Sequence, residues 1–277
     1  MAEMALFLGR MIWKSLPLFA ASLAIALTAS AQDWVKSRLE NTPRHLEWVK
    51  VSQGPRTVDA FIAFPEVKNK ATAVVVIHEI FGLTDWVRGV TDQLAEAGYI
   101  AIAPDLLSGM GPNGGGSTSF GGGDGVRKAI GALPPEQVTA DLNAVVEHVA
   151  KLPACNGKVV VAGFCWGGTQ TFKFLTRNQT VKAGFVFYGT APENPEEIMQ
   201  ITAPIYGFYG GNDARVNASI PKTEEAMKAA QKKYEPIVYE GAGHGFMRAG
   251  EAPDANEPNK AARAAAWTRW KTLLEKI

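Results

Sequence analysis

The chain has 277 residues, of which 47% are hydrophobic and 20% charged, with a formal net charge of +1. This composition is typical of a globular protein with enough length for one large hydrophobic core or two small ones. A near-neutral charge without Lys- or Arg-rich runs disfavours a nucleic-acid partner, so we expect the chain to bind a small, neutral or modestly charged molecule.

The first 31 residues have the pattern of a secretory signal peptide. Arg10 and Lys14 form a positive flank, Leu16–Leu27 is an apolar run, and Ala29-Ser30-Ala31 is a small-residue cleavage signature. A spanning helix needs roughly 20 apolar residues, so an uncleaved anchor is the weaker alternative. We expect cleavage after Ala31, a periplasmic or secreted protein without a stable membrane anchor, and a monomer with a single domain over residues 32–277.

From Asp59 onward, short β-branched or aromatic runs alternate with longer amphipathic stretches. This alternation predicts the α/β class, with a mostly parallel central sheet flanked by helices on both faces. The predicted strands are Val58–Phe64, Ala73–His78, Tyr99–Ala103, Lys158–Gly163, Gly184–Tyr188, Ile205–Tyr209 and Ile237–Tyr239. The predicted helices are Val87–Ala97, Pro135–Lys151, Trp166–Arg177, Pro221–Lys233 and Asn259–Glu275.

A glycine-rich segment, Gly109–Gly125, interrupts this alternation. So many glycines predict a loop rather than a helix or strand. A phosphate-binding loop is disfavoured, because the G-x-x-x-x-G-K-[ST] pattern lacks its lysine here. Two alternatives stay open: a mobile surface loop, or a flexible flap beside an active site.

The two cysteines, Cys155 and Cys165, are not expected to form a disulfide. The predicted strand between them rises about 3.3 Å per residue, which separates their α-carbons far beyond the roughly 7 Å that a disulfide tolerates. Both thiols should therefore be free.

Cys165 stands in the sequence Gly163-Phe164-Cys165-Trp166-Gly167, where a predicted strand meets a predicted helix. This is the pattern of a nucleophile elbow, a strained strand-to-helix turn whose glycines avoid clashes around the nucleophile. A helix N-terminus also favours the thiolate over the thiol. The alternative is an inert cysteine buried in a glycine turn.

A nucleophile in this position needs a base and an acid that orients the base, in the chain order nucleophile, acid, histidine. Of the four histidines, His45 precedes the core, His78 ends an early strand, and His148 lies within a predicted helix. His244 follows the last strand in a glycine-rich loop, and Asp213 follows the preceding strand, so these two are the candidate base and acid. The alternatives are an exposed loop histidine and an aspartate that caps a turn.

Five motifs carry a resemblance to a known family: "HEIFGL" from His78, "GYIAIAPDLL" from Gly98, "GFCWGG" from Gly163, "GGNDARV" from Gly210 and "GHGFMR" from Gly243. From about Arg44 to the C-terminus, the chain resembles the dienelactone hydrolase family of α/β-hydrolases. The resemblance implies the α/β-hydrolase fold and a catalytic triad of Cys165, Asp213 and His244.

The resemblance also implies further site residues. Glu79 would hydrogen-bond near the thiol and control its ionisation, with a structural ion pair as the alternative, and the backbone amides of Ile80 and Trp166 would form the oxyanion hole. Arg248 matches one of the two arginines with which the family binds a substrate carboxylate. The other arginine, expected after "PDL", has no counterpart, because Ser108 and the glycine-rich segment follow there. This departure weakens the expectation that dienelactone itself is the substrate.

The expected reaction is hydrolysis of a lactone or an activated (enol or aryl) ester through a thioester intermediate on Cys165. Neither a metal ion nor an organic cofactor is expected. Two other functions stay open: an exported acyltransferase, and a non-catalytic protein that binds a small molecule on the same fold.

Overall fold

The structure is a computed structural model that describes residues 34–277. The predicted signal peptide lies outside these residues. Within the described part of the chain, no helix is both long enough and apolar enough to span a membrane.

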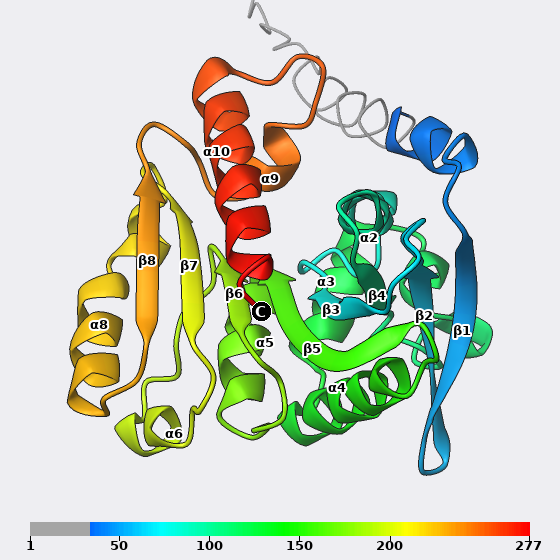
Figure 1. Ribbon diagram of the computed structural model, residues 1–277, viewed down its shortest axis with the longest axis horizontal. Helices are drawn as coiled ribbons and strands as arrows, with labels where there is room; N and C mark the ends of the chain where they lie inside the picture. Colours follow the sequence, from blue (N-terminus) through cyan, green and yellow to red (C-terminus); the bar gives the residue numbers. More distant parts are fainter. Residues whose placement is uncertain (1–33) are drawn as a thin grey trace, which may run out of the picture.

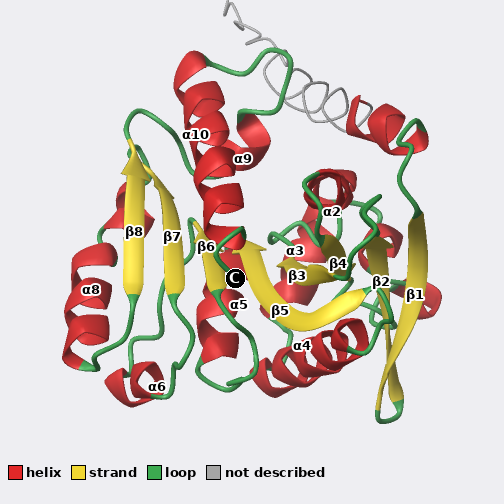
Figure 2. Cartoon of the chain, in the orientation of Figure 1, coloured by secondary structure: helices red, strands yellow, loops and turns green. Residues whose placement is uncertain are grey.

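A single eight-stranded sheet runs through the described residues, in the order β1-β2-β4-β3-β5-β6-β7-β8 (Figure 2). The strands are β1 Leu46–Gln53, β2 Arg56–Ala63, β3 Ala71–Ile77, β4 Ile100–Pro104, β5 Cys155–Phe164, β6 Gly184–Phe187, β7 Ile205–Gly210 and β8 Tyr234–Tyr239. β2 pairs antiparallel with both β1 and β4, and every other pairing is parallel. The predicted α/β class with a mostly parallel sheet is confirmed.

Helices cover both faces of the sheet (Figure 1). The α-helices are α2 Asp85–Glu96, α3 Gly123–Gly131, α4 Pro135–Ala150, α5 Trp166–Leu175, α6 Pro195–Met199, α7 Ala214–Asn217, α8 Ile220–Ala229, α9 Phe246–Ala249 and α10 Glu257–Leu274. Strand side chains alternate between two buried cores: Val75 and Val161 pack with the face covered by α3, α4, α5 and α8, whereas Val74 and Val160 pack with the face covered by α2, α9 and α10. The near-continuous apolar runs of β3 and β5 follow from this double burial.

Strand β1 was not predicted from the sequence. It lies at the edge of the sheet, and Val51 is its one buried residue, so the strand lacks the continuous apolar run on which the prediction depended. Trp48 within it is 54% exposed. An edge strand that packs so few side chains leaves a weak hydrophobic pattern.

The glycine-rich segment is more ordered than the predicted loop. It contains two short 3₁₀ turns, Pro112–Gly114 and Ser117–Phe120, and α3 begins at Gly123. The buried Ser117 ties the segment down, because its hydroxyl donates to Asp105 Oδ1 at 2.6 Å and accepts from the amide of Leu83 at 3.0 Å. The prediction of a loop therefore holds up to residue 122, apart from these two turns, and is wrong for residues 123–125, which belong to α3. Buried hydrogen bonds to distant residues order the segment despite its glycine content.

Candidate active site

Cys165 occupies the turn between β5 and α5 with φ 55° and ψ −114°, in the left-handed half of backbone space that a non-glycine residue rarely adopts. The flanking glycines are required sterically. A Cβ on Gly163 would lie 2.0 Å from the carbonyl oxygen of Gly167, and a Cβ on Gly167 would lie 2.3 Å from that of Ile77. Only glycine allows α5 to approach β3 and β5 this closely, and this approach holds the thiol at the carboxyl end of β5.

The structure brings Cys165, His244 and Asp213 into one hydrogen-bonded line. His244 Nε2 lies 3.1 Å from Cys165 Sγ, and His244 Nδ1 lies 2.5 Å from Asp213 Oδ2. The three residues follow β5, β8 and β7 at the carboxyl ends of neighbouring parallel strands. The side chain of Asp213 is 6% exposed and that of His244 is 34% exposed, so the line runs from a buried carboxylate toward the surface.

Backbone contacts between two loops fix Asp213 against His244. The amide of Asn212 donates to the carbonyl of Ala242 at 2.8 Å, and a Cβ on Gly210 would lie 2.5 Å from the carbonyl oxygen of Gly243. Asp213 also caps α7, since its Oδ1 accepts from the amide of Val216 at 3.4 Å. Asp213 therefore caps α7 through Oδ1 and pairs with His244 through Oδ2, so the two alternatives are compatible.

The surroundings of His244 favour its protonated form. The hydrogen bond to Cys165 is the largest cause and the hydrogen bond to Asp213 adds to it, so that despite partial burial the pKa of His244 is raised to about 9. A proton on Nε2 at neutral pH is what an imidazole needs in order to stabilise a thiolate or to protonate a leaving group.

Two backbone amides beside the thiol are available as donors. Among the hydrogen bonds of residues 34–277, neither the amide of Ile80 nor that of Trp166 donates to a protein acceptor. Trp166 is the first residue of α5, where helix amides lack intrahelical partners, and Ile80 lies just beyond β3, against which this turn of α5 packs. Such a pair of free amides can hold a developing oxyanion.

Glu79 forms an ion pair with Arg248, whose Nε donates to Glu79 Oε2 at 2.9 Å. No hydrogen bond joins Glu79 to the thiol in the described residues, so the geometry matches the ion-pair alternative rather than direct contact with Cys165. Burial raises the pKa of the Glu79 carboxyl, and the charge of Arg248 opposes that rise. The Arg248 guanidinium also stacks over Phe81 at 5.3 Å, with Nε engaged by Glu79.

His78 supports the site rather than acting as a base. It is fully buried, and desolvation lowers its pKa, so it remains neutral. Its Nδ1 donates to the carbonyl of Glu79 at 2.9 Å, its Nε2 accepts from the amide of Leu106 at 3.4 Å, and its ring stacks on Trp166. These contacts fix the turn after β3 that carries the amide of Ile80.

Two residues near the site were not predicted from the sequence. Tyr188 packs its ring edge-on against His244 with the centroids 5.0 Å apart, and Arg127 of α3 places its guanidinium 5.8 Å from the ring of Phe81. The sequence places Tyr188 only at the end of a predicted strand, and Arg127 follows the glycine-rich segment, whose composition predicts a loop. A polar aromatic residue at the carboxyl end of a buried parallel strand was the available signal for Tyr188.

Comparison with known proteins agrees with this arrangement. Residues 58–277 match the model of the dienelactone hydrolase family. A Salmonella typhimurium protein provisionally named carboxymethylenebutenolidase is 34% identical, over 81% of this chain and 83% of its own length. A Bradyrhizobium protein provisionally named 2-oxo-3-(5-oxofuran-2-ylidene)propanoate lactonase is 27% identical, over 83% and 92% of the two chains.

The fold agrees as well. The crystal structure of a provisionally assigned dienelactone hydrolase from Klebsiella pneumoniae superposes with a TM-score of 0.74 at 24% identity, covering 85% of this chain and all of that one. The family match spans most of the chain, and the motifs that contain Cys165, Asp213 and His244 meet at the carboxyl ends of the parallel strands. The chain therefore belongs to the dienelactone hydrolase family and is a hydrolase with the α/β-hydrolase fold.

Proposed function

We propose that the protein hydrolyses lactones or activated enol and aryl esters through a thioester on Cys165. The observation that carries this proposal is the line of hydrogen bonds from Asp213 through His244 to the sulfur, at 2.5 Å and 3.1 Å. With the thiol proton already held on His244 Nε2, the thiolate attacks the carbonyl carbon, and the amides of Ile80 and Trp166 hold the oxyanion. The leaving oxygen then takes the proton from His244.

The second half of the reaction regenerates the thiolate beside protonated His244. His244 takes a proton from water, the resulting hydroxide attacks the thioester carbonyl, and collapse of the tetrahedral intermediate releases the carboxylic acid and the Cys165 thiolate, while His244 keeps the proton. Asp213 accepts from Nδ1–H throughout and stabilises the imidazolium.

The nucleophile restricts the substrate class. A thiolate leaves the tetrahedral intermediate readily, so forward collapse requires that the substrate oxygen leave at least as readily. This condition favours enol esters, aryl esters and strained lactones over alkyl esters and amides. The names of the two sequence relatives reported above support lactones within this class.

The proposal is tested by hydrolysis of p-nitrophenyl acetate. Cys165→Ala should abolish hydrolysis, whereas Cys155→Ala should retain it, because Cys155 is buried at the opposite end of β5. Full activity in Cys165→Ala would remove the thiol from the reaction. A product carrying the acyl group on an added alcohol would indicate an acyltransferase, and slow labelling by iodoacetamide near neutral pH would indicate an inert thiol and a binding protein.

We further propose that the protein is exported and cleaved after Ala31. The fold supports this position, because the chain joins the folded body soon afterwards: Val35 is 3% exposed, and Arg44 forms an ion pair with Asp92 at 2.7 Å. N-terminal sequencing of protein from the periplasm or medium should therefore begin at Gln32. A cytoplasmic product that begins at Met1 would contradict export. The monomeric state stays a prediction that sedimentation can check.

A further inference from the structure

The carboxylate of Glu251 lies in a buried cluster of hydrogen bonds that the proposed mechanism does not use. Its side chain is 5% exposed, and the residue follows α9 in the connection to α10. Four nitrogen donors surround its two oxygens: Arg38 Nη1, Gln93 Nε2 and Arg263 Nη2, each 3.1 Å from Oε1, and Trp86 Nε1, 2.8 Å from Oε2. These donors come from the helix that precedes β1, from α2 and from α10, so one buried carboxylate joins three segments to the end of α9.

Backbone hydrogen bonds connect Glu251 to the candidate base. The amide of Glu251 donates to the carbonyl of Arg248 at 3.2 Å, and the amide of Arg248 donates to the carbonyl of Gly245 at 3.0 Å. This series runs from Glu251 back to the residue that follows His244. Arg263 braces the same turn, since its Nε donates to a backbone carbonyl of α9 at 3.1 Å. A shift of the Glu251 carboxylate therefore moves α9 and the backbone at His244.

The other oxygen of the same carboxylate is connected to the nucleophile. Trp86 is 5% exposed, and its ring packs edge-on against Phe164 with the centroids 5.0 Å apart. Phe164 is fully buried and directly precedes Cys165, so the position of the Trp86 indole influences the elbow. Glu251 thus links the two sides of the 3.1 Å contact between His244 and the sulfur.

We propose that Glu251 is a positioning residue that holds His244 at hydrogen-bonding distance from Cys165. It acts through α9 on one side and through Trp86 on the other. A buried carboxylate that loses a donor is costly, so these contacts stay closed in the folded protein. The role of Glu251 in turnover rests on the proposed function, whereas its role in the contact between thiol and imidazole does not.

Alkylation of Cys165 by iodoacetamide at pH 7 tests this positioning without turnover. Glu251→Gln keeps the shape of the side chain but replaces one acceptor oxygen by an amide nitrogen that donates, so at least one of the four donors loses its acceptor. His244 then moves away from the sulfur, and the thiol holds less of its reactive thiolate form. Alkylation should slow roughly tenfold or more, and kcat/KM for p-nitrophenyl acetate should fall on the order of 10- to 100-fold.

Trp86→Phe is the second variant, and it decides the matter if Glu251→Gln does not fold. It keeps an aromatic ring against Phe164 and removes the donor to Oε2, so alkylation should slow here as well. The matched control is Trp267→Phe, the same change at a tryptophan that is 9% exposed and whose Nε1 has no partner among residues 34–277. Alkylation in this control should stay within twofold of wild type.

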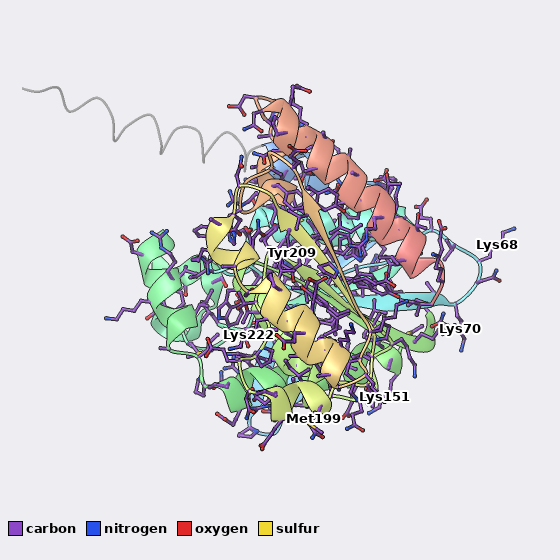
Figure 3. The ribbon with its side chains drawn as sticks, turned by 90° about the vertical axis from the view of Figure 1, so that its left-hand side faces the viewer. Lys68, Lys70, Lys151, Met199, Tyr209 and Lys222 are labelled. Carbon is purple, nitrogen blue, oxygen red and sulfur yellow. The ribbon has the colours of Figure 1, made fainter. Side chains whose placement is uncertain are left out.

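Tyr209→Phe controls for a loss of stability alone. Tyr209, labelled in Figure 3, is 1% exposed, and its hydroxyl pairs with that of Tyr234 at 2.7 Å in the core on the other face of the sheet. Its substitution should lower the midpoint of unfolding by urea and leave alkylation unchanged. Circular dichroism at the assay temperature shows that each variant is folded.

The outcomes separate this proposal from the proposed function. Alkylation in Glu251→Gln that is as fast as in wild type or faster would overturn the positioning role, and so would an equal slowing in either control. Slower alkylation of Glu251→Gln with unchanged hydrolysis would support the positioning of His244 and would contradict the reaction through Cys165 instead.

Discussion

Gly167→Ala tests whether the close approach of α5 to β3 positions the site. A Cβ at this position would lie 2.3 Å from the carbonyl oxygen of Ile77 and 2.5 Å from that of His78, both of them backbone atoms. Since real Cβ contacts stay beyond 3.0 Å, the first turn of α5 must move away from β3 by at least 0.7 Å, the difference between 3.0 and 2.3 Å. The move separates the amides of Trp166 and Ile80.

Misplacing reacting groups by about 1 Å costs on the order of 100-fold in rate, so kcat/KM for p-nitrophenyl acetate should fall roughly 100-fold. Overpacking should also lower the free energy of unfolding by about 1–3 kcal/mol. The control is Gly131→Ala at the exposed end of α3, where an added Cβ meets nothing within 4 Å, and both activity and stability should be retained. Activity within twofold of wild type in Gly167→Ala would refute the claim that this close approach positions the site.

Three further predictions concern the supports of the site. Asp213→Asn should lower kcat by roughly 10²- to 10⁴-fold while the protein stays folded, because the amide cannot stabilise the imidazolium; circular dichroism and steady-state kinetics check this. Because the pKa of His244 is raised from 6.5 to about 9, its stabilisation is complete below pH 6.5 and is lost as the pH rises through 9. The stability difference between wild type and His244→Gln in urea titrations should therefore shrink over that interval, and a difference that grows would contradict the assignment. Ser117→Ala should lower the free energy of unfolding by about 1–3 kcal/mol, since it removes a donor to buried Asp105 and leaves the amide of Leu83 unpaired; unchanged stability would mean that these bonds do not hold the glycine-rich segment.

The elbow and the candidate triad were predictable because their signals are local. Strained turns and close packing require glycines at fixed offsets from Cys165, and the carboxyl ends of parallel strands share one edge of the sheet. A residue in the loop that follows a strand, as Asp213 and His244 are, therefore lies near the others whatever the intervening sequence. The predicted strands that correspond to β3, β4, β6 and β7 agree with the structure because burial on both faces gives continuous apolar runs. Only Ile237–Tyr239 of β8 was predicted, and that strand has no buried residue.

The partner of Glu79 could not be read from the sequence alone. A carboxylate after a buried strand needs a donor, but both a thiol and an arginine satisfy that need, and only tertiary geometry selects Arg248. The order of the glycine-rich segment also depends on a distant residue, since Asp105 accepts both the amide and the hydroxyl of Ser117. Strand β1 was missed because an exposed edge strand buries too little to leave a pattern.

Trapping the acyl-enzyme tests the central claim most directly. Wild-type protein mixed with p-nitrophenyl acetate, quenched in acid within the first turnovers and digested, should carry one acetyl group on the peptide that contains Cys165, attached through sulfur. The Cys165→Ala protein should carry none. An acetyl group on a different side chain, or continued turnover with no acetylated peptide, would contradict the thioester mechanism.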